Sequence, residues 1–324
     1  MSDVRQRRRA PGDGTAAVTG PLIHIAPVSE PGLEDAVTRG GGRLASEADA
    51  DGVIWINPRD PQGLKDLLGR SSATWVQLPF AGIESFVGAG VVDPSLTWTC
   101  AKGIYGPACA EHAVALMLAG SRRLAHHARE RKWDEPGLGS PERRLKDATL
   151  LIVGLGGIGR ALADMVRPFG MHVLGTNRSG TPVPDVETHP SADLMELLPG
   201  ADFVAICAAL TDDTRGMISI RELDAMRPHA WLVNVARGGL VDTDPLVDAL
   251  REGTIGGAAL DVTDPEPLPA DHPLWSLDNV LITPHVANTW DMALPELREL
   301  VYRNVANFGS ERELEGLVDP GLGY

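Results

Sequence analysis

The sequence has few cysteines, and their number and spacing exclude two kinds of framework. Its 324 residues include three cysteines, Cys100, Cys109 and Cys207. No two of them form a C-x-x-C pair, and an odd number at wide spacing is not typical of a disulfide framework or a zinc site. We therefore expect a chain without a bound metal, in the reducing environment of the cytoplasm.

Basic residues are fewer than acidic ones, and long apolar runs are missing. The chain has 29 basic and 44 acidic residues, a net charge of −15, which argues against nucleic acids and anionic membranes as partners. A local arginine can still bind an anionic substrate against this overall field. No run of about 18 apolar residues is present, so the sequence predicts no membrane-spanning helix.

The N-terminus carries four arginines within residues 5–9. Such a cluster can begin a secretory signal, but residues 10–20 are rich in Gly, Pro and Thr and form no apolar segment. We therefore predict that residues 1–20 form a disordered tail. An arm that binds nucleic acid is the less favoured alternative.

What the sequence does contain is an alternation of strand-like and helix-like segments. Short apolar runs at residues 22–25, 52–56 and 74–78 predict strands of a small α/β unit. A helix is predicted from residue 109 to 124, followed by an arginine-rich connector to residue 146. Six further strand candidates follow, as expected of a complete doubly wound sheet: residues 150–153, 172–174, 203–208, 230–235, 258–262 and 280–282.

The last predicted element is an amphipathic helix at residues 293–308. We expect it to pack back on the first unit. The substrate domain would then consist of residues 21–103 and 287–324, with an NAD(P)-binding domain, residues 104–286, inserted between them. The chain would then cross twice between the two domains, and a cleft would lie between them.

A glycine turn follows the first strand of the inserted domain. Gly154, Gly156, Gly157, Ile158 and Gly159 fit G-x-G-x-x-G, with a strand before and a helical pattern after. The first glycine permits a tight turn, the second lets a pyrophosphate approach the backbone, and the last lets helix and strand pack closely. The helix N-terminus offers free N–H groups to the phosphate. The alternative is a turn with a structural role only.

The end of the next strand indicates which dinucleotide binds. An NAD enzyme usually carries an acid there for the ribose hydroxyls, but this chain has Asn177, Arg178 and Ser179. Arg178 can pair with a 2′-phosphate, and its neighbours can donate hydrogen bonds. We therefore favour NADP over NAD; the alternative is a solvated Arg178 and bound NAD.

Further candidates for cofactor contacts lie at or after later strand ends. They are Cys207, Thr214, Val235 and Ala236.

Three polar residues follow three successive strand candidates. Arg237, Glu266 and His285 should converge, because the carboxyl ends of parallel strands line the ligand crevice. A histidine can exchange a proton near neutral pH, a carboxylate can orient it, and an arginine can bind a substrate carboxylate. Singly, each has a plainer interpretation: a surface turn, a solvated loop acid and a core histidine. His112, His126 and His127 are interpreted as structural or solvated.

At this point the sequence resembles the D-isomer-specific 2-hydroxyacid dehydrogenase family. The order and spacing of motifs agree with that family over roughly residues 75–310, in segments 103–106 (GIYG), 110–113 (AEHA), 153–159 (VGLGGIG), 234–239 (NVARGG), 259–268 (ALDVTDPEPL) and 283–285 (TPH). The resemblance implies a Rossmann cofactor domain inserted in a smaller flavodoxin-like α/β substrate domain. It also implies that Arg237, Glu266 and His285 are catalytic and that Asp261 lies beside the cofactor.

The resemblance further implies a loop that binds the substrate carboxylate and an arm that forms a homodimer. The loop is residues 78–83, with Leu78, Ala81, Gly82, Ile83 and, from the catalytic set, Arg237 as substrate contacts; the arm lies near Glu111 and the connector after it.

The expected activity is hydride transfer between NAD(P)H and a small 2-oxo acid or D-2-hydroxy acid. The loop has no basic residue and is apolar at Leu78, Pro79 and Phe80, which favours glyoxylate or hydroxypyruvate. A D-3-phosphoglycerate, formate or phosphonate dehydrogenase of the same family is one alternative. A dinucleotide-sensing binding protein with this fold is another; the intact catalytic set argues against it.

Overall fold

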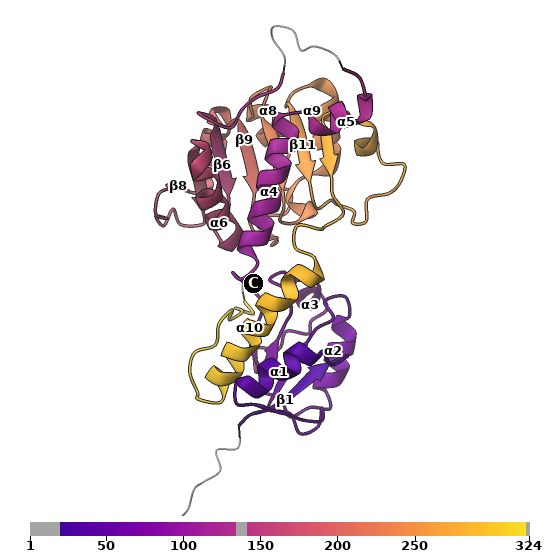
Figure 1. The fold of residues 1–324 in the computed structure, drawn as a ribbon, viewed down its shortest axis with the longest axis vertical. Coiled ribbons are helices and arrows are strands. Elements are labelled where there is room, and N and C mark those ends of the chain that lie inside the picture. The colour runs from indigo at the N-terminus through magenta and orange to yellow at the C-terminus, as the bar shows by residue number, and fades with distance from the viewer. Residues whose placement is uncertain (1–19, 134–140, 322–324) are drawn as a thin grey trace, which may run out of the picture.

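The computed structural model describes residues 20–133 and 141–321. The predicted tail, residues 1–20, therefore lies almost wholly outside the described residues. Two lobes are stacked along the long axis of the molecule, and each contains one parallel sheet (Figure 1). Within the described residues, no helix combines the length and apolar character needed to cross a membrane.

The first lobe contains a five-stranded parallel sheet in the order β2-β1-β3-β4-β5. This is the flavodoxin-like order, so the predicted fold class is confirmed for this lobe. Its strands are β1 Leu22–Ala26, β2 Arg43–Leu44, β3 Gly52–Trp55, β4 Trp75–Gln77 and β5 Thr97–Thr99. Its helices are α1 Pro31–Arg39, α2 Pro61–Leu68 and α3 Glu84–Gly88.

Local sequence explains where α1 and α2 begin. The Glu30 side chain accepts a hydrogen bond from Leu33 N, and the Asp60 side chain accepts one from Gly63 N. Each of these caps is followed by a proline, whose fixed φ suits the first helical turn.

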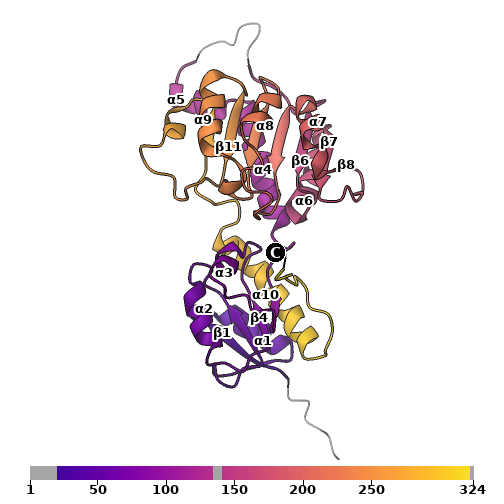
Figure 2. The ribbon, with the colours of Figure 1, turned by 180° about the vertical axis from the view of Figure 1, so that it is seen from behind.

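The C-terminal helix α10, Trp290–Phe308, packs on α1 in this first lobe (Figures 1 and 2). Its buried residues include Leu297, Leu300, Val301 and Val305, the face expected from the sequence. Buried Asn304 donates a hydrogen bond to Gln77 Oε1 on β4 at 2.8 Å. These contacts place the last helix beside the first sheet, while the domain boundaries stay a prediction.

The second lobe contains a seven-stranded parallel sheet in the order β12-β11-β10-β9-β6-β7-β8. The order reverses between β6 and β9, as in a Rossmann fold. Its strands are β6 Thr149–Val153, β7 His172–Asn177, β8 Glu187–Pro190, β9 Phe203–Ile206, β10 Trp231–Asn234, β11 Gly257–Leu260 and β12 Val280–Ile282. Its α-helices are α4 Gly106–Ser121, α5 Leu124–Glu130, α6 Gly157–Val166, α7 Leu194–Leu197, α8 Ile220–Ala225 and α9 Thr243–Glu252. Short 3-10 helices are Arg167–Phe169, Ser191–Asp193, Leu198–Gly200, Gly238–Leu240 and Pro273–Ser276.

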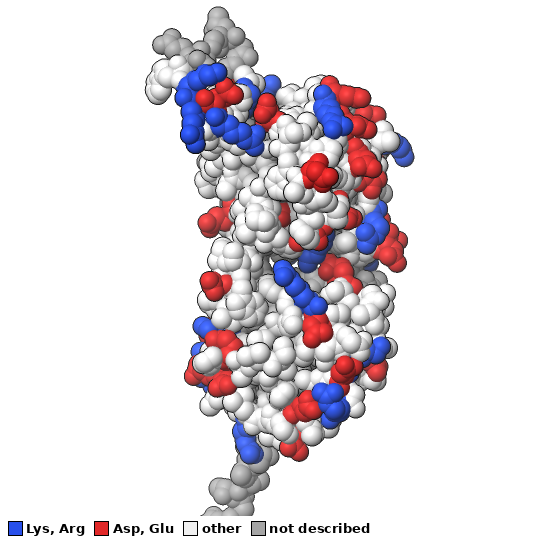
Figure 3. Space-filling model, turned by 90° about the vertical axis from the view of Figure 1, so that its right-hand side faces the viewer, with Lys and Arg blue, Asp and Glu red and all other residues white. Residues whose placement is uncertain are grey.

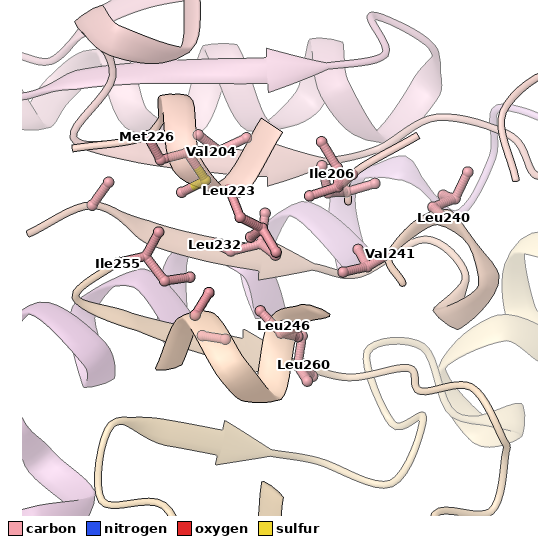
Figure 4. Close-up of a cluster of buried hydrophobic side chains, with 14 of the residues drawn as sticks. Val204, Ile206, Leu223, Met226, Leu232, Leu240, Val241, Leu246, Ile255 and Leu260 are labelled. Atoms are coloured by element: carbon pink, nitrogen blue, oxygen red, sulfur yellow. The ribbon is translucent and has the colours of Figure 1, made fainter. Parts of the chain in front are cut away.

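Helices cover both faces of this sheet. On β6, Leu150 and Ile152 join the core under α4 and α6, whereas Leu151 and Val153 join the core under α7, α8 and α9. Figures 1 and 2 show these two helix layers from opposite sides. Figure 4 shows the core under α7, α8 and α9, where Leu223 of α8 lies among strand side chains. Because side chains alternate along a strand, both sets must be apolar, which explains the unbroken apolar runs.

Candidate active site

The candidate site lies where the chain leaves β10, β11 and β12, which are neighbours in the second sheet. Arg237, Glu266 and His285 follow these three strands. Parallel strands place the three following loops at one edge of the sheet. Charged side chains of both signs are visible at the waist between the lobes (Figure 3).

The structure brings His285 and Glu266 into contact. His285 Nδ1 lies 2.6 Å from Glu266 Oε1, and the two side chains are 46 % and 44 % exposed. With Nδ1 facing the carboxylate, Nε2 is the ring nitrogen left to exchange a proton with a substrate. The pair therefore has the geometry of an oriented acid/base.

The backbone of His285 is held in an uncommon conformation. Its φ is +54°, in the left-handed region that non-glycine residues rarely adopt. His285 N donates to Asp261 O at 2.8 Å, and the Asp261 carboxylate accepts from Val286 N and Ala287 N at 2.9 Å each. Asp261 thus binds three successive backbone N–H groups and constrains the backbone that carries the imidazole.

Asp261 is a buried carboxylate, with 1 % of its side chain exposed. Burial opposes its ionisation, but hydrogen bonds from His112, Thr283, Val286 and Ala287 outweigh burial and lower its pKa to about 2. The side-chain contacts are Thr283 Oγ1 at 2.5 Å and His112 Nε2 at 3.3 Å. The cofactor contact expected of Asp261 stays a prediction.

His112 and Glu84 take part in this site although the sequence did not single them out for it. His112 lies on α4 and was interpreted as structural or solvated, while Glu84 received no role. The AEHA segment gave a signal for His112, a polar residue on a largely apolar helix, but no partner. Glu84 directly follows the predicted substrate loop, which was the available signal.

Arg237 reaches from the second lobe to the start of α3. Its Nε donates to Glu84 Oε1 at 3.2 Å and its Nη1 donates to Ala236 O at 2.7 Å. A Cβ added at Gly82 would lie 1.5 Å from Arg237 Nη2. The third nitrogen of the guanidinium therefore lies directly over the predicted substrate loop.

Within that loop the buried and accessible residues divide clearly. The side chains of Leu78 and Ile83 are buried in the core of the first lobe. Ala81 is exposed and Gly82 is half-buried, so these two residues can present backbone N–H groups to a carboxylate. The Tyr105 hydroxyl donates to Pro79 O at 2.7 Å and holds the backbone of the loop in place.

The glycine turn lies between β6 and α6 and fits a bound pyrophosphate. Gly154 has φ +106°, and a Cβ at Gly159 would lie 2.1 Å from Gly154 O. At Gly156 an added Cβ would meet no atom within 4 Å, which leaves open space in front of the backbone. Gly157 and Ile158 begin α6, whose N-terminus has no side-chain cap, so its N–H groups can bind phosphate.

The loop after β7 folds on itself. Asn177 Nδ2 donates to Thr181 O at 2.7 Å, and Asn177 Oδ1 accepts from Thr181 N at 3.0 Å. Ser179 Oγ lies 2.6 Å from Thr181 Oγ1, and Arg178 is exposed. Arg178 therefore lies directly after the end of β7, and its contact with a 2′-phosphate stays a prediction.

The remaining cofactor candidates lie in the segments that follow β9 and β10. Cys207 is buried, and burial raises its pKa to about 12. Thr214 Oγ1 closes a turn by donating to Ala209 O at 2.7 Å. Val235 and Ala236 are buried directly before Arg237. Their contacts with a cofactor stay predictions.

Comparison with known proteins decides the family. The sequence model described as "D-isomer specific 2-hydroxyacid dehydrogenase, NAD binding domain" matches residues 114–287. The chain belongs to the D-isomer-specific 2-hydroxyacid dehydrogenase family. Members are NAD(P)-dependent oxidoreductases of hydroxy acids, and this confirms the class of enzyme expected from the motifs.

Individual relatives and a solved structure extend the comparison. An uncharacterized protein of Corynebacterium melassecola is 40 % identical over 294 residues, covering 89 % of this chain and 95 % of that protein. The glyoxylate reductase of Thermofilum pendens is 40 % identical over 236 residues, covering 69 % of this chain and 67 % of the reductase. A crystal structure of a D-isomer-specific 2-hydroxyacid dehydrogenase from Xanthobacter autotrophicus with NADPH and MES has a TM-score of 0.81 at 25 % identity. It covers 94 % of this chain and 100 % of that one.

Across residues 20–133 and 141–321, no three His, Cys, Asp or Glu side chains are grouped to hold a metal ion.

Proposed function

We propose that this enzyme reduces small 2-oxo acids to D-2-hydroxy acids, with NADPH preferred and glyoxylate or hydroxypyruvate as leading substrates. The observation that carries the proposal is the 2.6 Å contact between His285 Nδ1 and Glu266 Oε1. It lies on the same edge of the sheet as Arg237, which contacts the predicted substrate loop.

The chemistry of these residues accounts for the reduction of a carbonyl. When bound, the nicotinamide supplies the hydride that goes to the carbonyl carbon. His285 gives a proton from Nε2 to the carbonyl oxygen, while Glu266 keeps the ring in one orientation. Arg237 binds the substrate carboxylate and polarises the carbonyl. One hydride and one proton convert C=O to H–C–O–H, so the reaction balances.

The surroundings of Arg237 favour a small substrate with a single carboxylate. The loop at residues 78–83 contains no basic residue, and Glu84 adds a negative charge beside it. A phosphorylated substrate would need extra cations at this place. The glyoxylate reductase of Thermofilum pendens supports the same substrate class.

The preference for NADPH rests on the loop after β7. No acid is present at Asn177–Ser179, and Arg178 is exposed at the strand end. The Xanthobacter autotrophicus structure, which is similar in fold, was solved with NADPH. Equal use of NADH and NADPH would contradict this part of the proposal.

The first experiment measures oxidation of NADPH and NADH with glyoxylate, hydroxypyruvate and a branched 2-oxo acid. We expect turnover with NADPH well above turnover with NADH. No turnover with any of these substrates, combined with dinucleotide binding, would favour the dinucleotide-sensing binding protein instead.

Two variants then test the assignment of the acid/base. We expect His285→Ala to abolish turnover and leave NADPH binding, measured by fluorescence, largely intact. His172→Ala, at the exposed start of β7, is the matched control and should keep full activity. Retained turnover in the His285 variant would contradict the mechanism.

We also propose that the enzyme is a homodimer formed through the helix near Glu111 and the connector after it. Helix α5 has no buried residue, and Leu124 at its start and Trp133 after its end are exposed apolar side chains, a pattern that favours burial against another chain. Light scattering should give twice the mass of 34.5 kDa. A monomer at micromolar concentration would contradict this part.

A further inference from the structure

His112 connects α4 to the segment that carries His285. Its Nε2 lies 3.0 Å from Thr283 Oγ1 and 3.3 Å from Asp261 Oδ1, and 20 % of its side chain is exposed. Thr283 directly follows β12 and lies two residues before His285. The two residues joined by the first contact are 171 positions apart in the sequence.

The direction of the hydrogen bonds follows from the number of protons. A threonine hydroxyl has one proton, and Thr283 Oγ1 lies 2.5 Å from an ionised carboxylate that can only accept. Thr283 therefore donates to Asp261. The contact between His112 and Thr283 must then use the proton on His112 Nε2, which is also shared with Asp261 Oδ1.

His112 thereby stands at the beginning of a chain of contacts that ends on the catalytic histidine. It holds Thr283 Oγ1 and Asp261 Oδ1 in place, and Asp261 holds the N–H groups of His285, Val286 and Ala287. His285 has the left-handed φ of +54°, which costs free energy and relaxes unless neighbouring contacts enforce it. Loss of one donor to the buried carboxylate weakens that enforcement.

We propose that His112 is a positioning residue for His285: its Nε2–H fixes the Thr283–Asp261 pair, and this pair fixes the backbone from which the imidazole reacts. The inference rests on the proposed function, because it assigns His112 a part in the same proton transfer. His112 itself touches neither of the reacting groups.

A purely structural role makes a different prediction. A histidine that only ties α4 to β12 would lower the melting temperature when replaced, and kcat would stay unchanged in the folded protein. A positioning role lowers kcat in folded enzyme, leaves KM for substrate and cofactor in place, and is restored by any side chain that donates at the same reach.

The experiment compares His112→Leu with His112→Gln, whose amide nitrogen can donate from nearly the same position. We expect His112→Leu to lower kcat at least tenfold with both KM values within threefold. His112→Gln should keep kcat within threefold of the unmodified enzyme. His24→Leu is the matched control, because His24 makes one part-buried hydrogen bond, to Ala45 O at 3.0 Å, far from the site. It should keep kcat.

Two outcomes would overturn the inference. One is a kcat for His112→Leu within twofold of the unmodified enzyme, and the other is a His112→Gln variant as slow as His112→Leu. If His112→Leu does not fold, Thr283→Val and Thr283→Ser repeat the test from the other end of the contact. Thr283→Val should be slow and Thr283→Ser should not.

Hydrogen exchange separates this inference from the proposed function. The peptide that contains Val286 and Ala287 should exchange faster in His112→Leu than in the unmodified protein, whatever substrate is turned over. Faster exchange in an enzyme inactive on all 2-oxo acids would contradict the proposed function and keep the positioning role. Unchanged exchange together with unchanged kcat would reject the positioning role alone.

Discussion

Arg237 and Glu84 form an ion pair that joins the two lobes, with Nε to Oε1 at 3.2 Å. The residues are 153 positions apart, and their side chains are 33 % and 35 % exposed. Ion pairs with this exposure contribute little to stability. The pair instead orients the guanidinium, because Nε is fixed by Glu84 and Nη1 by Ala236 O, which leaves Nη2 over Gly82.

Removal of the Glu84 acceptor should therefore reduce catalysis more than stability. We expect Glu84→Ala to lower kcat/KM for a 2-oxo acid by about tenfold, the size of one hydrogen bond to a charged group. Glu84→Gln keeps an oxygen acceptor and should lose no more than about threefold on the same argument. Steady-state kinetics and the NADPH dissociation constant check both; equal losses in the two variants would mean that charge, and not orientation, matters.

The close approach of Gly82 and Arg237 makes a sharper test. In Gly82→Ala the new methyl would occupy the position of Arg237 Nη2, at 1.5 Å, so the guanidinium or the loop must move. We expect kcat/KM to fall by about a hundredfold, as is typical when a substrate-binding group is displaced by an ångström. Cofactor binding should not change. Gly88→Ala is the control, because its methyl would meet no atom within 4 Å; an active Gly82→Ala enzyme would argue against a substrate role for this loop.

The sequence predicted the central strands and one edge strand, β12, and missed the other three edge strands. Central strands such as β6 are buried on both faces and appear as unbroken apolar runs. The three missed strands, β2, β5 and β8, all lie at an edge of their sheet. An edge strand pairs on one side only and can be short and polar, as Arg43–Leu44 and Glu187–Pro190 are. No local pattern distinguishes such segments from loops.

The site shows the same limit. Arg237, Glu266 and His285 could be selected because each follows a strand, so the sheet itself predicts where they lie. His112 and Glu84 contact that set only through the packing of distant segments, and nothing in the residues around them names a partner. Periodicity shows on which face of a helix a residue lies but not what lies opposite.

The lowered pKa of Asp261 predicts how stability depends on pH. Its pKa falls from an ordinary value of 3.8 to about 2 in the fold. A lowered pKa stabilises the fold fully above the unfolded-state value, and this contribution is lost as pH falls from about 4 to about 2. We expect Asp261→Asn to lower the free energy of unfolding at pH 7 by about 2 kcal/mol or more, from about 1.4 kcal/mol per pKa unit.

Urea unfolding at pH 7, 5, 4 and 3 checks this dependence. The difference between the unmodified protein and Asp261→Asn should be constant from pH 7 to 5 and shrink below pH 4. Asp278→Asn is the control, because that side chain is 81 % exposed. A difference that is the same at pH 7 and pH 3 would show that the carboxylate charge is not what stabilises the segment after β12.

Replacement of Arg178 should change the cofactor preference without harming the chemistry. We expect Arg178→Ala to raise KM for NADPH about tenfold, because the variant loses a guanidinium that pairs with the 2′-phosphate in a solvent-exposed loop. KM for NADH should stay within about twofold, because NADH has no 2′-phosphate for the arginine to pair with. Since salt screens exposed pairs, added salt should raise KM for NADPH in the unmodified enzyme and have less effect in the variant. Arg70→Ala, an exposed arginine beside Glu47 in the first lobe, is the control for general charge. If Arg178→Ala raises KM for both cofactors equally, the residue supports the loop rather than recognising the phosphate.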